Sequence, residues 1–171
     1  HPGDAFYGFL RILNYFVIFW IISQVLKNVE RTEALLQVML ASGFGVAGAG
    51  ILAALGYAQI PGAFDGRVIY STLQYPNTLA AYLAVTVIIG VTLWTRERHP
   101  GLQFIYLLAG SIMSLVVLAS MSKGAWLIYG LAALLLVAGM PGISRLKALY
   151  GLAFSFIGGL ASYIKFYPAM I

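Results

Sequence analysis

The chain has 171 residues, of which 61% are hydrophobic and only 9% are charged, and it contains no cysteine. A soluble domain of this length does not bury so much apolar side chain in one core, so the composition indicates an integral membrane protein and excludes disulfides and thiolate metal sites. The net charge of +5 gives no indication of nucleic-acid binding, because the basic residues have a topological explanation.

Long uncharged stretches predict six membrane-spanning helices, since a span needs about 20 mostly apolar residues at about 1.5 Å rise per residue. Unpaired backbone groups are costly in lipid, so each span is expected to be helical. The predicted spans are 5–26, 34–55, 77–94, 103–120, 124–139 and 148–164. The fourth and fifth could instead form one broken pair that meets at residues 122–124. The predicted fold is an all-α polytopic transmembrane bundle.

The chain begins with His1, and its first span carries an arginine rather than the pattern of a cleavable signal peptide. We therefore interpret residues 1–171 as part of a larger polytopic membrane protein. Arg11 falls at about a third of the depth of the first span, where a charge usually faces a bundle interior or a water-filled cavity. Tyr7, Asn14 and Tyr15 lie at helical spacing around it. Snorkelling of Arg11 to the headgroups is the alternative.

The second predicted span contains Gly-Phe-Gly-Val-Ala-Gly at positions 43–48, which matches GxGxxG, and Asp65 follows about 20 residues later. A dinucleotide-binding fold needs this motif between a strand and a helix, whereas here it lies inside an uncharged stretch of span length. Small residues four apart allow another helix to approach closely. The small residues at this spacing are Ala41, Gly45, Ala49 and Ala53. The motif thus predicts helix packing.

Cations fall unequally on the two sides of the predicted spans. One side receives Lys27, Arg31, Arg96, Arg98, Arg145 and Lys147, and the other receives Arg67, Lys123 and Lys165. The positive-inside rule predicts that the first set is cytoplasmic. The loop 56–76 and residues 120–124 then lie outside, so Arg67 and Lys123 share a face on which topology does not require cations.

Two external cations therefore need another explanation. A local pair with Asp65 is the simple alternative for Arg67, and interfacial anchoring beside Trp126 is the alternative for Lys123. Near the start of a helix, a guanidinium and an ammonium group are well suited to binding phosphate or pyrophosphate. We hypothesise an anion site at this face.

The sequence Ser-Thr-Leu-Gln-Tyr-Pro-Asn leads into the third span. Asn77 is predicted to be the N-cap, with its side chain accepting a hydrogen bond from the backbone N–H of Leu79 or Ala80. Such a capped helix directs its positive end to the outer face and is also an anion site. Tyr75 and Asn77 are therefore candidate substrate-binding residues.

His99 lies in a short connector between predicted spans, with no second ligand near it in the sequence, and is interpreted as a solvated loop histidine. The chain holds only two histidines and five acidic residues. We predict neither a metal site nor a cofactor.

Three short motifs follow one another in a characteristic order, namely Gly66-Arg67, Pro76-Asn77 and Ser122-Lys123-Gly124-Ala125. This order resembles the O-antigen ligase and O-antigen polymerase superfamily of bacterial envelope glycosyltransferases. In that family a Gly-Arg precedes a Pro-Asn at the start of a helix, and a Ser-Arg-Gly-Ala follows. The region that carries the motifs runs from about residue 62 to 128, so residues 1–171 resemble a partial transmembrane domain of this type.

The resemblance implies a multi-pass enzyme at the outer face of the bacterial cytoplasmic membrane. It would transfer a glycan from undecaprenyl pyrophosphate to a lipid or glycan acceptor, without a nucleotide sugar or a metal, and would contact membrane lipids. By this resemblance Arg67 and Lys123 are the catalytic candidates that hold the pyrophosphate. Arg11, Tyr75, Asn77 and Ser122 are the substrate-binding candidates.

Two features depart from the family pattern. Lys123 stands where the family has arginine, and an ammonium group lacks the planar fork that binds phosphate through two bonds. The family also places an important histidine in a large external loop, which neither His1 nor His99 matches, so no general base is assigned. A transporter or lipid-carrier flippase, and a non-catalytic scaffold of polysaccharide assembly, are alternative functions that also fit Arg11 and the small-residue helices.

Overall fold

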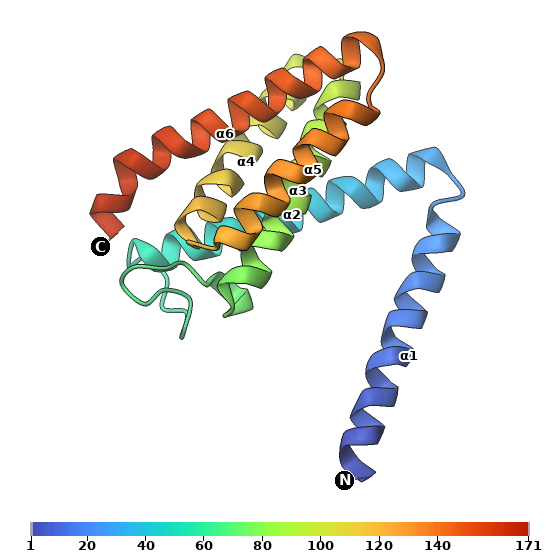
Figure 1. Cartoon of the computed structure of the whole chain (residues 1–171), viewed down its shortest axis with the longest axis vertical. Helices are drawn as coiled ribbons and strands as arrows, with labels where there is room; N and C mark the ends of the chain where they lie inside the picture. Colours follow the sequence, from blue (N-terminus) through green and yellow to red (C-terminus); the bar gives the residue numbers. More distant parts are fainter. Residues whose placement is uncertain (1, 171) are drawn as a thin grey trace. The chain divides into compact units, whose positions relative to one another are not determined.

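The computed structural model describes residues 2–170, and His1 and Ile171 lie outside the description. Within that range the side chains of residues 2–5, 7, 11, 25, 167, 169 and 170 are also outside it. The helices are α1 (Pro2–Val25), α2 (Val29–Ala54), α3 (Pro76–Arg96), α4 (Pro100–Ala119), α5 (Lys123–Gly139) and α6 (Gly142–Met170), with a short 3₁₀ turn η1 (Ser71–Leu73) (Figure 1). The all-α prediction is confirmed.

Each predicted span coincides with one of these helices. The helices that are long and apolar enough to cross a membrane are Val29–Ala54, Pro76–Arg96, Pro100–Ala119 and Gly142–Phe166. The segments Gly8–Gln24 and Lys123–Gly139 are shorter apolar helices. These lengths and compositions indicate a multi-pass membrane protein.

The fourth and fifth predicted spans are two helices joined by the short turn at residues 120–122. The helix α4 ends at Ala119, α5 begins at Lys123, and the turn between them places Met121 at a left-handed φ of 52°. Because a left-handed residue cannot continue an α-helix, the two segments are separate helices.

The chain divides into two compact units, His1–Leu36 and Gln37–Ile171. The first unit contains α1 and the beginning of α2, where the Asn28 side chain caps the helix by accepting a hydrogen bond from the backbone N–H of Glu30 at 2.9 Å. Large apolar side chains of α1 are exposed all along its length, among them Ile12 and Phe19. A helix that is apolar on all sides is typical of a segment surrounded by lipid.

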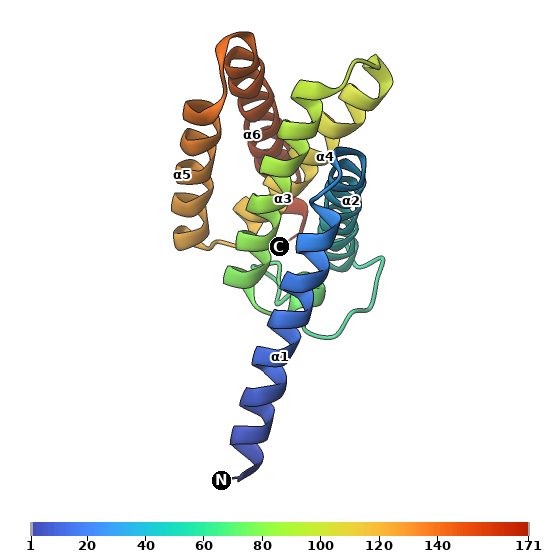
Figure 2. The same ribbon diagram turned by 90° about the vertical axis from the view of Figure 1, so that its right-hand side faces the viewer.

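In the second unit α4 packs against both α3 and α6. Figure 2 shows α5 at the left of this unit, on the outer side of α6. Small residues allow α4 and α6 to approach closely. A Cβ added at Gly158 would lie 2.6 Å from the Ser111 hydroxyl, and one added at Gly159 would lie 2.8 Å from the backbone nitrogen of Leu115. Close backbone approach through small residues is the usual way in which helices associate in lipid.

The helix α2 packs on α3 through the glycine-rich motif, as predicted, but through a different face. Its buried positions are Leu40, Gly43, Ala47, Gly50 and Ala54. A Cβ at Gly43 would lie 2.6 Å from the Thr86 hydroxyl, and one at Gly90 would lie 2.9 Å from the Leu40 side chain. The predicted contact row at positions 41, 45, 49 and 53 is therefore wrong. The Leu40 side chain packs against Gly90 of α3, so the row of α2 that faces α3 is the adjacent one, which contains Leu40, Gly43 and Ala47.

The α4–α6 contact supplies a test of the packing. Gly159→Leu should destabilise the protein by about 3 kcal/mol, because the new side chain meets backbone atoms of α4 that cannot move aside. The matched control is Gly130→Leu in α5, where an added Cβ meets nothing within 4 Å. Thermal unfolding in detergent micelles measures both, and equal Tm values for the two variants would contradict the packing described.

Candidate functional site

The loop between α2 and α3 folds around the Asp65 side chain. One carboxylate oxygen of Asp65 accepts hydrogen bonds from the backbone N–H groups of Arg67 at 2.9 Å and Val68 at 2.7 Å. The other accepts a hydrogen bond from the Tyr70 hydroxyl at 2.8 Å. Gly66, at the corner of this turn, has a φ of 90°, which only glycine adopts readily. The conformation of the Gly-Arg motif is thus set by its neighbours.

These bonds keep Asp65 ionised. The backbone N–H of Val68 and then the Tyr70 hydroxyl stabilise the carboxylate and hold the pKa of Asp65 below its usual value. The same bond raises the pKa of Tyr70, because its proton is shared with an anion. Arg67 itself is exposed on the loop.

The loop is fixed to the ends of two helices. The backbone N–H of Ile69 donates to the carbonyl of Ala119, the last residue of α4, at 3.3 Å. The buried Ser71 hydroxyl donates to the carbonyl of Val46 in α2 at 2.6 Å. These two bonds hold the loop against α2 and against the end of α4, so the loop lies at the end of the bundle where α4 ends.

A hydrogen bond joins the two remaining motifs across 45 residues of sequence. The Ser122 hydroxyl donates to the side-chain oxygen of Asn77 at 2.8 Å. The same hydroxyl accepts from the backbone N–H of Ala125 at 3.3 Å and so caps α5. The starts of α3 and α5 therefore lie side by side, and two positive helix ends point to the same face.

Asn77 does not cap α3. The N-cap is Tyr75, which makes no side-chain capping bond, and Pro76 occupies the first helical position. Proline is favoured there because the first N–H of a helix has no partner to lose. Pro76 thus places Asn77 inside the first turn, where its amide reaches Ser122 and lies 3.5 Å from the Tyr75 hydroxyl.

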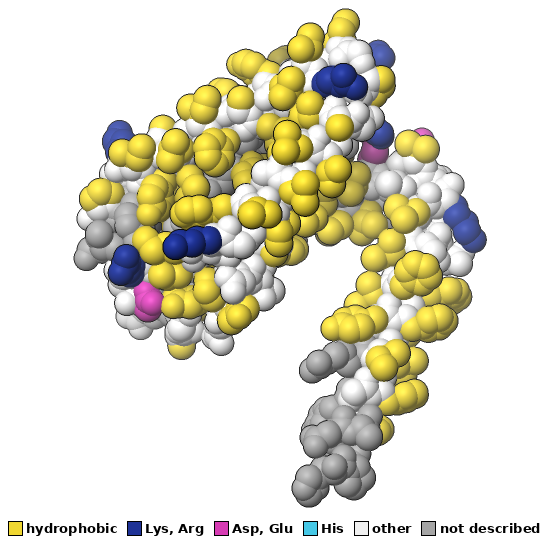
Figure 3. Space-filling view, in the orientation of Figure 1, with side chains coloured by type: hydrophobic (Ala, Val, Ile, Leu, Met, Phe, Trp, Pro, Cys, Tyr) yellow, Lys and Arg dark blue, Asp and Glu magenta, His cyan; other side chains and the backbone are white. Residues whose placement is uncertain are grey.

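The structure therefore brings five of the predicted site residues to one end of the second unit. These are Arg67 on the loop, Tyr75 and Asn77 at the start of α3, and Ser122 and Lys123 at the start of α5. Figure 3 shows basic side chains beside an acidic one at this end of the bundle. Arg11 belongs to α1 in the first unit, and its side chain lies outside the described part of the chain.

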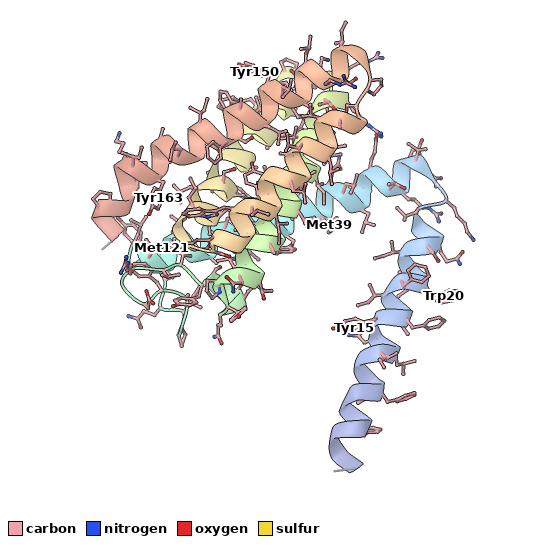
Figure 4. All side chains as sticks on the ribbon, in the orientation of Figure 1. Tyr15, Trp20, Met39, Met121, Tyr150 and Tyr163 are labelled. Carbon is pink, nitrogen blue, oxygen red and sulfur yellow. The ribbon has the colours of Figure 1, made fainter. Side chains whose placement is uncertain are left out.

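Trp126 has a structural role that the sequence did not indicate. Its indole N–H donates to the carbonyl of Val117 at 3.0 Å, and the Ser120 hydroxyl donates to the same oxygen at 2.7 Å. This carbonyl belongs to the last turn of α4, where no helical partner remains for it. Trp126 thus holds the turn that contains Met121 against α4. Met121 is one of the residues labelled in Figure 4.

The connector at the opposite ends of α3 and α4 contains His99. The Glu97 carboxylate accepts hydrogen bonds from the backbone N–H groups of His99 and Arg98, which lower the pKa of Glu97. The His99 side chain is exposed, as expected for a loop histidine. Among the residues that the structure describes, no group of three or more histidine, aspartate or glutamate side chains is placed to hold a metal ion.

Comparison of the chain with protein-family models, with curated proteins and with solved structures gives no match. The class that the fold defines is a multi-pass helical membrane protein. Any more particular assignment depends on the three short motifs and on the geometry that surrounds them.

The hydrogen bonds of Asp65 can be tested by titration. Because the folded pKa of Asp65 is lowered, its bonds stabilise the loop above the unfolded pKa of about 3.9 and are lost as the pH falls through the folded pKa. The Val68 amide resonance in detergent should therefore titrate with a midpoint below about 3.9. Tyr70→Phe should raise this midpoint, and Tyr57→Phe in the same loop should not. A midpoint of about 4 or above in the parent protein would contradict the turn.

The Asn77–Ser122 bond can be measured with a double-mutant cycle. The alanine substitutions Asn77→Ala and Ser122→Ala should be coupled by about 0.6–1 kcal/mol in the free energy of unfolding. Ser122→Ala should also lower the free energy of unfolding by about 1 kcal/mol, because it removes the N-cap of α5. Thr78→Ala paired with Ser122→Ala is the control and should show no coupling. Equal coupling in both cycles would mean that the bond is not specific.

Proposed function

We propose that the chain is the transmembrane part of a glycosyltransferase of the O-antigen ligase and polymerase type, with six spans in the bacterial cytoplasmic membrane. It moves a glycan from undecaprenyl pyrophosphate to a lipid or glycan acceptor at the outer face. The observation that supports this best is the hydrogen bond between Asn77 and Ser122, because it joins the Pro-Asn and Ser-Lys-Gly-Ala motifs. The Gly-Arg motif lies at the same end of the bundle.

The position of Lys123 favours an anionic ligand. Lys123 is the first residue of α5, and the first turn of this helix contains no acidic residue. A cation at a helix N-terminus is unfavourable, because the backbone N–H groups there already carry partial positive charge. The first turn of α3 beside it also lacks an acidic residue. A phosphate group bound between the two helix starts would offset this accumulated positive charge.

Arg67 and Lys123 have different roles in this proposal. A guanidinium group forms two parallel bonds with a phosphate group, so Arg67 binds and orients the pyrophosphate. Lys123 acts as a point charge. Tyr75, Asn77 and Ser122 border the same face, and the exposed ring of Tyr75 offers a surface to the glycan. Arg11 remains a proposed substrate contact.

The reaction is a displacement at the anomeric carbon of the donor sugar. The oxygen of an acceptor hydroxyl forms the new bond to this carbon as the bond from the carbon to the pyrophosphate oxygen breaks. Negative charge grows on the departing pyrophosphate, and fixed cations that meet it in the transition state accelerate the step. The acceptor proton leaves with a base that these residues do not provide, since the carboxylate of Asp65 is engaged by its own loop.

Substitution of Arg67 tests the function. In the full protein, Arg67→Ala should lower glycan transfer from a polyprenyl-pyrophosphate donor by about 10²–10³-fold, the effect of removing one donor that stabilises a transition-state anion. Lys123→Ala should also impair transfer, and Lys123→Arg should retain it. The control is Arg98→Ala, which removes a cation from the opposite end of the bundle.

Membrane insertion is measured on the same variants by immunoblot of membrane fractions. The pyrophosphate proposal fails if Arg67→Ala inserts normally and transfers glycan at the rate of the parent protein. A loss of transfer in Arg98→Ala equal to that in Arg67→Ala would also remove it, because the effect would not be specific to this face.

A further inference from the structure

An apolar groove of about 360 Å³ lies between α2, α4 and α6 in the second unit. Its walls include Phe44, Leu52, Ile112, Leu115 and Phe166, with Gly48 between them. This volume is within the range of about 300–1,000 Å³ that holds small ligands or parts of them. None of the residues of the proposed transferase site lines the groove.

A cation lies beside one wall residue of the groove. Lys165 precedes Phe166, and its ammonium nitrogen lies 5.6 Å from the centre of the Phe166 ring. Lys165 is the one charged residue in positions 151–170 of the sequence. It is located at the end of the apolar segment Gly142–Phe166, the depth at which lysine side chains reach lipid headgroups.

Gly48 leaves space in the wall of the groove. A Cβ added at Gly48 would meet no atom within 4 Å, although the residue is part of the groove. The same is true of Gly45, which lies outside the groove. A Cβ at either position therefore clashes with nothing, and a side chain at position 48 would extend from the wall of the groove.

We propose that this groove binds one acyl chain of an anionic phospholipid, whose phosphate group contacts the Lys165 ammonium. An apolar groove with a lysine beside its wall residue Phe166 complements a molecule with a hydrocarbon chain and a negative charge. A phosphodiester carries a single charge, whereas a carrier pyrophosphate carries more than one and calls for several cations. The surrounding bilayer supplies the lipid, and anionic headgroups attract lysine at this depth. The proposal is independent of the transferase function.

The test is native mass spectrometry of the full chain in neutral detergent, titrated with phosphatidylglycerol. Gly48→Leu should weaken binding about tenfold, the effect of displacing about two methylene groups from apolar contact. Lys165→Gln should weaken it about fivefold, as expected for one lysine at an anionic headgroup. The matched controls Gly45→Leu and Lys147→Gln should bind as the parent protein does.

Two further lipids decide between occupants. Phosphatidylcholine should bind about fivefold more weakly than phosphatidylglycerol and should not respond to Lys165→Gln. Equal affinity for the two phospholipids, or an unchanged affinity in Gly48→Leu, would overturn the proposal. If undecaprenyl phosphate binds more tightly than phosphatidylglycerol and is lost in Gly48→Leu, the groove belongs to the carrier lipid and the proposal is also overturned.

Discussion

The hydrogen bond between the Ser122 hydroxyl and the Asn77 side chain is the interaction on which the arrangement of the candidate site depends. Ser122 accepts a bond from Ala125 as it donates to Asn77, so one hydroxyl both begins α5 and fastens it to α3. Pro76 makes this possible by taking the first position of α3 and leaving the Asn77 amide free to face its neighbour. Two helix starts, each without an acidic residue, are thereby held together.

Close packing supports this junction from within the bundle. Glycines 158 and 159 bring α6 against serines of α4, and Gly43 brings α2 against Thr86. In lipid there is little hydrophobic force between helices, so such contacts and buried hydrogen bonds supply the association. The loop then depends on the same frame, since Ile69 and Ser71 bond to carbonyls of α4 and α2. Arg67 is thus carried by a loop with fixed ends.

Local sequence patterns predicted the helices but not the contacts between them. The predicted span 77–94 falls within α3, because the length of an apolar run depends only on the chain itself. The contact face of α2 was predicted wrongly, since two adjacent rows of small residues run along this helix and the fit of Leu40 against Gly90 distinguishes them. Asn77 was likewise taken for a local cap, because its partner Ser122 is 45 residues away. The Asp65 turn uses partners within five residues, and Trp126 bonds to Val117, nine residues earlier, so both depend on local geometry that residue types alone do not give.

The central claim is that the loop and the start of α5 share the outer face of the membrane. Since the chain contains no cysteine, single-cysteine variants can be labelled in intact cells with a membrane-impermeant maleimide. Thr72→Cys and Gly124→Cys should react in intact cells, and His99→Cys should react only after the membrane is opened. Protection of Thr72→Cys or Gly124→Cys in intact cells, or labelling of His99→Cys there, would contradict the account.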